Sequence, residues 1–425
     1  MSEQIDMAKG KRTKRSRLPY LGEDVLFKIF TKCHPKTIGR LRMLSHHWND
    51  RLRGPVFARL NWRENDERDK SLMVGCGYTS YNDKSHWAVA VSAKDGAVSD
   101  VRVPIQLEDY GYYSIIGSDR GNLCVKFSKT GEQVEFMVWN PLTKVVAEVD
   151  DQSFNYWGYS VSVYAFGYLS DGWQYRVVYL FKKMYSNKKF NWLKWNSLER
   201  YWSQKGEFEY DIHKIGPTSV VISGVVYWIG WGGIMNTHPT HLIGFFLEDA
   251  TFFQDEIPEG NRREFHSIAK LNKGLAFVAY QDVAYQRQVE VWSIECTEDR
   301  KFLWQKLYNI QDFGIPHIPS ILHRDEVISV MDIRSTMSGS NDDRRTELVI
   351  SKMKQIGGAR NIIYHNGWQM NGNGRSHKKI QAFTSYAQDV NVTPGLVNPN
   401  LLVTQTTGNY SVNSLRYSNS VGFSD

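Results

Sequence analysis

Residues 121–140 read GNLCVKFSKTGEQVEFMVWN, a pattern that recurs through much of this 425-residue chain. Two short runs with alternating or mainly apolar residues, Leu123–Phe127 and Glu135–Trp139, flank a polar segment that contains glycine. Such runs, bounded by turn-forming residues, are typical of paired β-strands. Aromatic residues make up 13% of the chain, which also favours strands over helices. The sequence therefore predicts a large all-β region.

A glycine begins each of four such strands, and the four glycines recur at nearly constant spacing. Gly121, Gly172, Gly224 and Gly274 lie 51, 52 and 50 residues apart. A period near 50 residues, with several short strands per unit, is typical of kelch-like β-propellers. One step further each way reaches the apolar runs 72–74 and 327–330. We therefore expect a six-bladed β-propeller-like region, closed with the help of a late strand at 380–383; a pair of β-sandwiches is the alternative.

Residues 18–57, which precede the all-β region, carry a helical pattern. Apolar side chains recur at three- and four-residue spacing from Leu21 to Phe30 and again from Ile38 to Leu52. Pro35 interrupts the pattern, and Gly54-Pro55 is expected to end it. The pattern predicts a small all-α module of three helices. Because so small a module buries little surface, we expect it to leave apolar surface for a partner.

Positive charge is concentrated near the N-terminus. Residues 1–63 contain 15 Lys/Arg and 5 Asp/Glu, a balance of +10, whereas the whole chain carries +7, so the remainder carries −3. The basic run Lys9–Arg17 cannot pack into a core, and it is either a solvated tail or a nuclear-import signal. The nearly neutral remainder argues against nucleic acid as the principal ligand, because phosphate binding needs clustered positive charge.

These patterns divide the chain into five segments. We expect a basic disordered tail at 1–16, the helical module at 17–62, a charged linker at 63–70, the all-β region at 71–388 and a second disordered tail at 389–425. No apolar run reaches the roughly 18 residues of a membrane helix, and no secretory signal is visible. The four cysteines are solitary, which suits an intracellular chain. The expected location is the nucleus, the cytoplasm or both.

The helical module closely resembles the F-box family in motifs that follow one another in order. The matching residues are Leu18-Pro19, Asp24-Val25-Leu26, Ile29-Phe30, Pro35-Lys36-Thr37-Ile38, Arg40-Leu41-Arg42-Met43-Leu44-Ser45, Trp48 and Gly54-Pro55-Val56-Phe57. His34, Thr37 and His46 stand where the family usually has proline, serine and lysine. The resemblance implies that the module docks on a Skp-family adaptor, which tethers it to the cullin scaffold of a ubiquitin ligase.

Carried over position by position, the resemblance also implies a set of adaptor-binding residues. They are Leu18, Pro19, Leu26, Ile29, Phe30, Leu41, Leu44 and Trp48. The alternative, which applies to Leu41 and Trp48 above all, is that some of them only hold the helices together. Burial of a few such side chains contributes roughly 1.5–3 kcal/mol each before association costs, which is enough for a stable complex.

The all-β region resembles the F-box-associated domain of the large plant-type F-box family. The matching residues are Gly117-Ser118, Gly121-Asn122-Leu123-Cys124, Val138-Trp139-Asn140-Pro141-Leu142-Thr143-Lys144, Ala165-Phe166-Gly167-Tyr168, Tyr175-Arg176-Val177-Val178, Gly224-Val225-Val226-Tyr227-Trp228 and Val289-Glu290-Val291-Trp292. Tyr227 stands where the family usually has histidine. The resemblance implies a recognition domain for a target protein. Its motifs are strand and turn framework, so they name no ligand.

Motifs for catalysis and cofactor binding are absent from the sequence. It contains no P-loop, no nucleophile elbow, no H-E-x-x-H and no dinucleotide fingerprint. His238 and His241 have proline between them and no third ligand nearby, so we expect no metal and no cofactor. Trp157, Trp231 and Trp368 lie near turn-rich segments and are candidate substrate-binding residues, with packing under a loop as the alternative.

The expected function is that of a non-catalytic substrate-recognition subunit of an SCF-type ubiquitin ligase. The F-box would bind a Skp-family adaptor and, through it, a cullin, while the β region would bind an unidentified target protein. Two alternatives belong to other classes of protein. One is a propeller-type carbohydrate-binding protein or enzyme with a vestigial F-box, and the other is a nucleic-acid binder that uses the basic tail.

Overall fold

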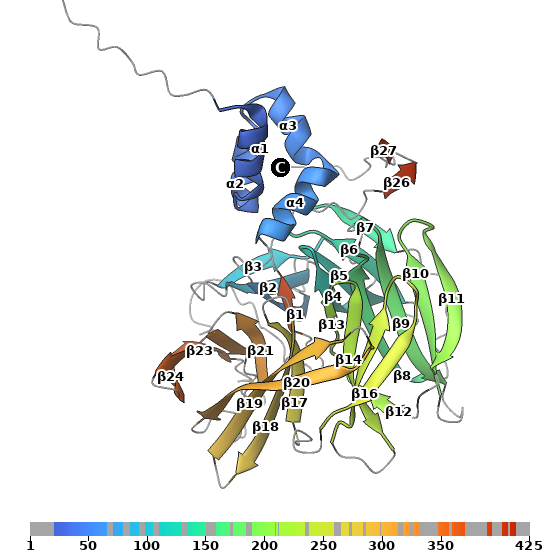
Figure 1. The fold of residues 1–425 in the computed structure, drawn as a ribbon, viewed down its shortest axis with the longest axis vertical. Helices are drawn as coiled ribbons and strands as arrows, with labels where there is room; N and C mark the ends of the chain where they lie inside the picture. Colours follow the sequence, from blue (N-terminus) through green and yellow to red (C-terminus); the bar gives the residue numbers. More distant parts are fainter. Residues whose placement is uncertain are drawn as a thin grey trace, which may run out of the picture.

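In the residues that it describes, the computed structural model has four helices near the N-terminus, followed by a large all-β region of several sheets (Figure 1). The described residues are 21–65, 71–79, 86–92, 98–104, 110–129, 134–149, 159–170, 173–183, 189–208, 210, 212–233, 238–258, 265–271, 274–283, 286–297, 299–312, 318–323, 326–330, 347–356, 359–369, 389–392, 402–406 and 409–413. This order of a small all-α part and a large all-β part is the predicted one.

The helical module contains four described helices where the sequence predicted three. They are α1 (Glu23–Thr31), α2 (Pro35–Leu41), α3 (His46–Arg53) and α4 (Pro55–Asn65). The prediction was wrong at Gly54-Pro55: α3 ends at Arg53, and Pro55 is the first residue of α4. Proline suits this position because the first N–H of a helix has no intrahelical partner. Helix α4 extends to Asn65, so residues 63–65, which were expected to begin the linker, are helical.

The helical module has a small core of its own. Phe30, Ile38, Leu52 and Phe57 are buried there. Trp48 packs against this core, and its ring meets that of Phe30 edge to face, with the ring centroids 4.9 Å apart. One side chain from each helix thus contributes to the buried cluster, which holds the four helices together.

Two buried asparagines fasten α4 to the end of α1. The side-chain amide of Asn61 donates hydrogen bonds of 2.9 Å and 2.8 Å to the carbonyl oxygens of Thr31 and Cys33. The Asn65 amide donates to the same two oxygens at 3.1 Å and 3.3 Å. The last carbonyl groups of a helix lack partners within it, and here the two amides supply them.

The β region is built from strands that pair with their neighbours in antiparallel fashion, except that β17 and β21 pair in parallel. The strands are β1 (Ser71–Thr79), β2 (His86–Ser92), β3 (Val98–Arg102), β4 (Tyr110–Asp119), β5 (Asn122–Lys129), β6 (Val134–Trp139), β7 (Val146–Val149), β8 (Tyr159–Tyr168), β9 (Tyr175–Lys183), β10 (Phe190–Asn196), β11 (Tyr201–Phe208), β12 (Ile212–Ile215), β13 (Val220–Ile222), β14 (Val225–Gly232), β15 (His241–Phe246), β16 (Phe252–Glu256), β17 (Phe265–Leu271), β18 (Gly274–Val283), β19 (Gln286–Cys296), β20 (Phe302–Asp312), β21 (Ile318–His323), β22 (Glu326–Val330), β23 (Glu347–Ile356), β24 (Ala359–Gln369), β25 (Asp389–Val392), β26 (Leu402–Thr406) and β27 (Asn409–Asn413). The sheet orders are β25-β1-β2-β3, β4-β5-β6-β7, β11-β10-β9-β8, β12-β14-β15-β16 with β13 beside β14, and β20-β19-β18-β17-β21-β22; β23–β24 and β26–β27 are two-stranded.

The glycine repeat marks the start of the second strand in successive sheets. Gly121 and Gly224 lie between paired strands, directly before β5 and β14, and Gly274 is the first residue of β18. Gly172 lies outside the described residues. The first extrapolated unit, which begins at 72–74, falls in the sheet of β1, β2 and β3. The spacing of the glycines therefore reflects one sheet per unit.

The end of the β region departs from the six equal units that the repeat predicted. Residues 327–330 lie in β22, which belongs to the sheet of β17–β20, whereas β23 pairs with β24 alone. The described sheets thus have two to six strands, and hydrogen bonds do not join them into one closed sheet. The late strand expected at 380–383 lies outside the described residues. Strand β25, in the segment predicted as a tail, pairs instead with β1.

One turn geometry recurs between the third and fourth strands of four units. Lys144, Arg200, Ala250 and Arg300 lie in these turns and have φ angles of 60°, 57°, 58° and 60°. This left-handed conformation is uncommon for residues other than glycine. Its recurrence shows that the four units share one turn conformation, although the residue types at this position differ.

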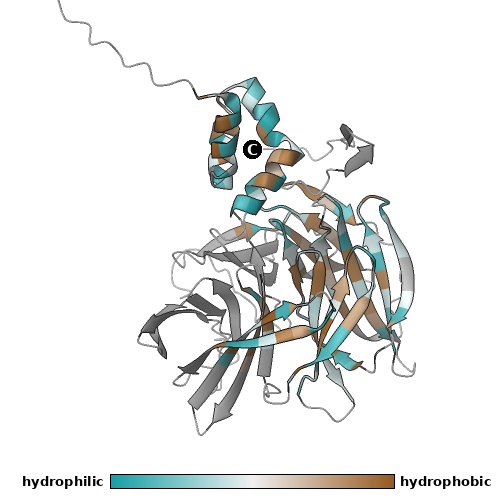
Figure 2. Ribbon diagram, in the orientation of Figure 1, coloured by the Kyte–Doolittle hydropathy of each residue, from teal (hydrophilic) through white to brown (hydrophobic). Residues whose placement is uncertain are grey.

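The core of the β region lies between neighbouring sheets. Phe136, Tyr179 and Trp195 are buried in a cluster shared by the β4–β7 and β8–β11 sheets, and Trp228 and Phe245 lie in the next cluster. Figure 2 shows hydrophobic residues along the central strands of these sheets. Since each sheet packs against its neighbours, the sheets depend on one another for burial.

The helical module packs on one end of the β region. Consecutive antiparallel strands place alternate turns at opposite ends, so the turns after the first and third strands of a sheet share one end. Helix α4 contacts this end, because the Arg59 guanidinium lies 5.4 Å from the ring centroid of Trp173, between β8 and β9. Ala58 and Trp62 of α4 belong to the same buried cluster as Tyr168. We call this the helical end and the opposite one the far end (Figure 1).

Candidate protein-binding surfaces

The helical module exposes large apolar side chains although its own core is filled. Val25 and Ile29 lie one turn apart on α1 and are 47% and 45% exposed, and Leu21, just before the helix, is 46% exposed. Met43 and Leu44, between α2 and α3, are 84% and 63% exposed. We call these five, together with Val56 of α4, the exposed apolar residues of the module. Exposed apolar side chains gathered on a small module are typical of a protein-binding surface.

The predicted adaptor-binding residues fall into four groups. Ile29 and Leu44 are exposed. Leu26, Leu41 and Trp48 are half-buried against the module core, and Phe30 lies inside it. Leu18 and Pro19 lie outside the described residues. Sequence reasoning did not single out Met43, although it is the most exposed of the large apolar side chains described here.

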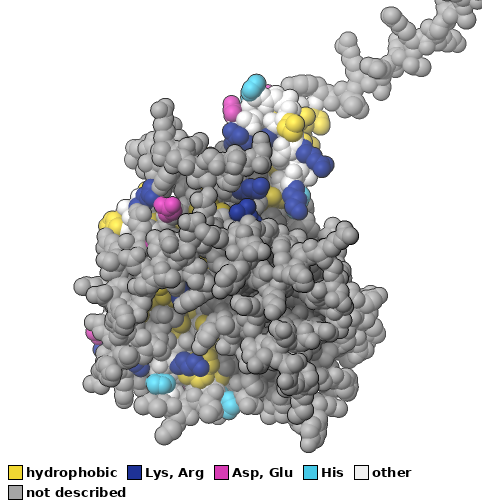
Figure 3. Space-filling view, turned by 180° about the vertical axis from the view of Figure 1, so that it is seen from behind, with side chains coloured by type: hydrophobic (Ala, Val, Ile, Leu, Met, Phe, Trp, Pro, Cys, Tyr) yellow, Lys and Arg dark blue, Asp and Glu magenta, His cyan; other side chains and the backbone are white. Residues whose placement is uncertain are grey.

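The module carries an excess of positive charge beside its exposed apolar residues. Residues 21–65 contain nine Lys/Arg and four Asp/Glu. One of these acids, Glu23, is already engaged, because its carboxylate lies 3.1 Å from Arg51 Nη1 and 3.2 Å from His47 Nε2. Figure 3 shows Lys and Arg side chains next to hydrophobic ones on the module. A partner with acidic groups around an apolar surface would complement this arrangement.

Two of the three candidate substrate-binding tryptophans lie in described strands. Trp231 is half-buried near the end of β14. It packs against the buried cluster between the sheet of β12–β16 and the sheet of β17–β22. Trp368 lies in β24, where it pairs with Leu348 of β23. Trp157 lies outside the described residues. Of the three candidates, Trp231 alone has described side-chain contacts.

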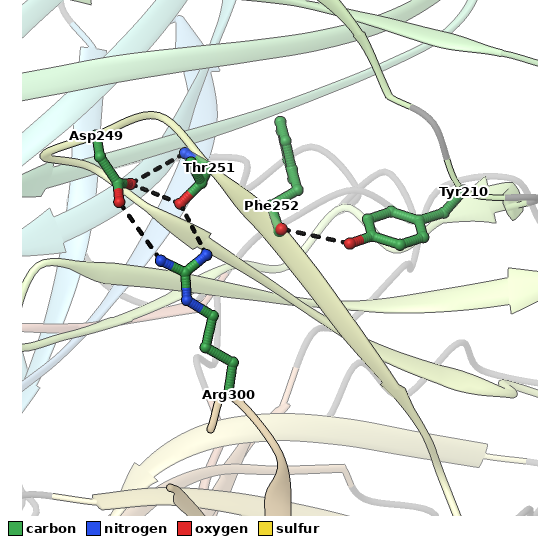
Figure 4. Close-up of polar contacts among 5 residues, drawn as sticks. All are labelled: Tyr210, Asp249, Thr251, Phe252 and Arg300. Carbon is green, nitrogen blue, oxygen red and sulfur yellow. Dashed lines mark hydrogen bonds and ion pairs between the residues drawn. The ribbon is translucent and has the colours of Figure 1, made fainter. Parts of the chain in front are cut away.

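A polar contact group clamps two sheets together at the helical end (Figure 4). Arg300, in the β19–β20 turn, lies 3.6 Å from Asp249 Oδ2 and donates a 3.3 Å hydrogen bond to Thr251 Oγ1. Asp249 in turn accepts hydrogen bonds from the Thr251 hydroxyl and backbone N–H, at 2.6 Å and 3.1 Å. Next to this group, Tyr210, which lies between β11 and β12, donates to the carbonyl oxygen of Phe252 at 3.3 Å. Every polar group here has a partner within the chain, so this group aligns the sheets.

The buried titratable groups are scattered rather than gathered in a reactive centre. Burial lowers the pKa of Lys126, whose ammonium lies 4.6 Å from the centroid of the Tyr164 ring. Burial and the nearby Arg176 lower the pKa of Lys194. Burial raises the pKa of the Cys124 thiol. Among the described residues, no three His, Cys, Asp or Glu side chains are placed to hold a metal ion. Of the helices described, none is long and apolar enough to cross a membrane.

No family model and no curated protein matches this chain. Among solved structures, a Bacteroides uniformis protein assigned as a 6-phosphogluconolactonase aligns at 12% identity and a TM-score of 0.36, over 71% of this chain and 98% of its own. An acylaminoacyl peptidase from Pyrococcus horikoshii aligns at 8% and 0.34, over 70% and 51%. The Aleuria aurantia lectin aligns at 12% and 0.31, over 58% and 80%. Similarities of this size assign neither activity nor ligand to the chain.

Proposed function

We propose that this chain is a substrate-recognition subunit of an SCF-type ubiquitin ligase. Helices α1–α4 form the F-box, which binds a Skp-family adaptor and through it a cullin, and the β region binds a target protein. The chain itself carries out no catalytic step. The F-box motifs of the sequence and the surface of the helical module support this proposal.

The observation that carries the proposal is the division of apolar side chains within the module. Phe30, Ile38, Leu52 and Phe57 fill its core, and yet further large apolar residues face solvent. Ile29 and Phe30 are neighbours in sequence, but one is 45% exposed and the other 7%. Leaving the exposed apolar residues in water costs free energy that a docked adaptor would recover at about 25 cal/mol per Å² buried.

The contacts between sheets support a propeller-like arrangement of the β region. Strands β4, β8, β13 and β17, one from each of four successive sheets, contact one another in this order, and β17 pairs with β21 within its own sheet. Strand β21 contacts β25, which pairs with β1, and both of these strands contact β4. Such a circular series of contacts is what a ring of sheets around a central axis requires. A propeller of six units remains part of the proposal.

Co-purification tests the proposed function directly. The full chain, co-expressed with a Skp-family adaptor and a cullin, is expected to elute as one complex in which the chain and the adaptor are equimolar. The nucleic-acid alternative predicts instead that the chain is retained on immobilised DNA or RNA and released steeply by salt. Elution of the chain free of adaptor would contradict the proposed function.

We also propose that Lys9–Arg17 directs the protein to the nucleus, because this basic run precedes the helical module. Replacement of its Lys and Arg by Gln is expected to reduce nuclear fluorescence of a tagged protein and to leave adaptor binding unchanged. An unchanged distribution of the fluorescence between nucleus and cytoplasm would contradict the nuclear signal and favour the solvated tail.

A further inference from the structure

A lysine and a tryptophan pair across two strands at the far end of the β region. Lys214 of β12 is opposite Trp231 of β14 in the sheet register, and its ammonium lies 4.8 Å from the centroid of the indole ring. A Cβ on Gly216 would lie 3.5 Å from the ring, so this residue borders the indole as well. His213, next to Lys214, is exposed, as Lys214 is. We call Lys214, Trp231 and His213 the far-end patch.

The far-end patch keeps its positive charge uncompensated within the described part of the chain. Lys214 has the Trp231 ring as its interaction partner and no carboxylate within ion-pair distance among the described residues. His213 has no described hydrogen-bond or ion-pair partner. Two described acids toward this end have other neighbours: Glu207 pairs with Lys189 at 3.4 Å, and Glu256 is opposite His241 in the register.

In a second lysine–tryptophan pair, a carboxylate compensates the charge of the lysine. Lys306 of β20 lies 5.5 Å from the centroid of the Trp292 ring and 2.6 Å from the Glu290 carboxylate. Glu290 neutralises the ammonium, so this pair offers no charge to a ligand. Lys214 also lies by a tryptophan ring but has no such acid among the described residues, and an external carboxylate could take the acid's place.

The far-end patch is well separated from the helical module. Strand β14 begins at the Ser223-Gly224 turn, which lies at the helical end, and reaches Trp231 at the opposite end. At about 3.3 Å per residue, the six steps from Val225 to Trp231 cover roughly 20 Å. Figure 3 shows Lys or Arg and His side chains beside hydrophobic ones at the end opposite the module. A ligand there would leave the helices free to bind another protein.

We propose that the far-end patch binds an acidic peptide segment of the target protein. This inference rests on the proposed function and names the chemistry of its substrate. Lys214 and His213 contact carboxylates of the segment, and Trp231 packs against a neighbouring apolar side chain. An indole beside a cation suits such a segment, because Trp231 contributes a large apolar surface and the Lys214 ammonium selects for negative charge.

Selection from a phage-displayed library of random 12-residue peptides tests this proposal with the full chain. The enriched peptides are expected to contain several Asp or Glu around an apolar residue. For one synthetic peptide from this set, fluorescence polarisation should show affinity about 10-fold to 100-fold weaker for Lys214→Gln, as expected when a charge-assisted hydrogen bond is lost. The matched variant Lys306→Gln should bind the peptide like the unaltered chain.

Three results would overturn the proposal: enrichment of peptides that are not acidic, no enrichment, or equal affinity for Lys214→Gln and the unaltered chain. Tight binding of a phosphoserine peptide, with no binding of its aspartate counterpart, would assign the patch to phosphopeptides instead. Adaptor binding by Lys214→Gln is measured separately and should be unchanged. A failure of peptide binding with intact adaptor binding therefore rejects this inference alone.

Discussion

The side-chain amide of Asn61 donates a 2.9 Å hydrogen bond to the carbonyl oxygen of Thr31. This bond joins the fourth helix of the module to the end of the first. Because α4 also places Ala58 and Trp62 in a cluster of the β region, a continuous series of contacts runs from α1 into the sheets. The exposed apolar residues of the module are thereby held in a fixed orientation relative to the β region.

Replacement of Asn61 by Ala should destabilise the helical module. The carbonyl oxygens of Thr31 and Cys33 would each lose one of two donors and keep the Asn65 amide, so the loss costs about 0.5–1.5 kcal/mol for each hydrogen bond. Chemical denaturation followed by circular dichroism measures the change in the free energy of unfolding. Glu64→Ala, an exposed change on the same helix, serves as the control, and equal stabilities of the two variants would contradict the assigned role of Asn61.

Replacement of Trp62 by Ala should destabilise the β region although the residue lies in a helix. Trp62 is 9% exposed and packs with β-strand residues, and removal of a buried Trp side chain costs about 3–5 kcal/mol. Thermal unfolding of the β region, followed by near-ultraviolet circular dichroism, tests this expectation. The neighbouring exposed change Arg63→Ala should have little effect. Unfolding of the β region at an unchanged temperature in Trp62→Ala would show that α4 is not part of its core.

Replacement of Lys126 by Met should stabilise the protein most at neutral pH. Burial lowers the pKa of Lys126 from 10.5 in the folded state, so the unfolded chain binds more protons between the lowered pKa and 10.5. The free energy of unfolding of the unaltered chain therefore rises with pH through that window, and the full cost of the buried charge is present below it. Methionine removes this cost and still packs against the Tyr164 ring.

Urea denaturation of Lys126→Met and the unaltered chain at several pH values measures this difference. The advantage of the variant should shrink as the pH approaches 10.5. Lys301→Met, at an exposed turn position, serves as the control. An advantage that is absent at neutral pH, or that grows with pH, would contradict the expected cost of burying Lys126.

The sequence predicts the general architecture because its strongest signals are periodic. The glycines at 121, 224 and 274 mark strand starts, and the stripe from Leu21 to Phe30 marks α1. The fourth helix was missed because Pro55 both ends one pattern and begins another. The recurring left-handed turns were also missed, because Lys144, Arg200, Ala250 and Arg300 are not glycine.

The candidate surfaces were only partly predictable, because they depend on how elements face one another. The helical stripe contains both Ile29 and Phe30, and only packing against α2, α3 and α4 decides which of them is buried. Trp231 was singled out from the sequence as a single residue. Its partner Lys214 lies 17 positions earlier, and the register between β12 and β14 brings the two together. No local sequence pattern encodes that register.

Binding of a Skp-family adaptor to a folded surface variant tests the central claim most directly. Ile29 and Leu44 are exposed, so Ile29→Asp with Leu44→Asp should leave the module core intact. Leu198→Asp with Leu303→Asp, two exposed leucines of the β region, is the matched control. Circular dichroism first establishes that both double variants fold, and calorimetric titration with purified adaptor then gives each Kd.

We predict that the Ile29/Leu44 variant binds the adaptor about 2–4 kcal/mol more weakly than the unaltered chain, roughly 30-fold to 1,000-fold in Kd, while the control variant binds with unchanged affinity. Adaptor binding at full strength by the folded Ile29/Leu44 variant would contradict the assignment of the surface. No measurable binding by the unaltered chain would contradict the proposed ligase function itself.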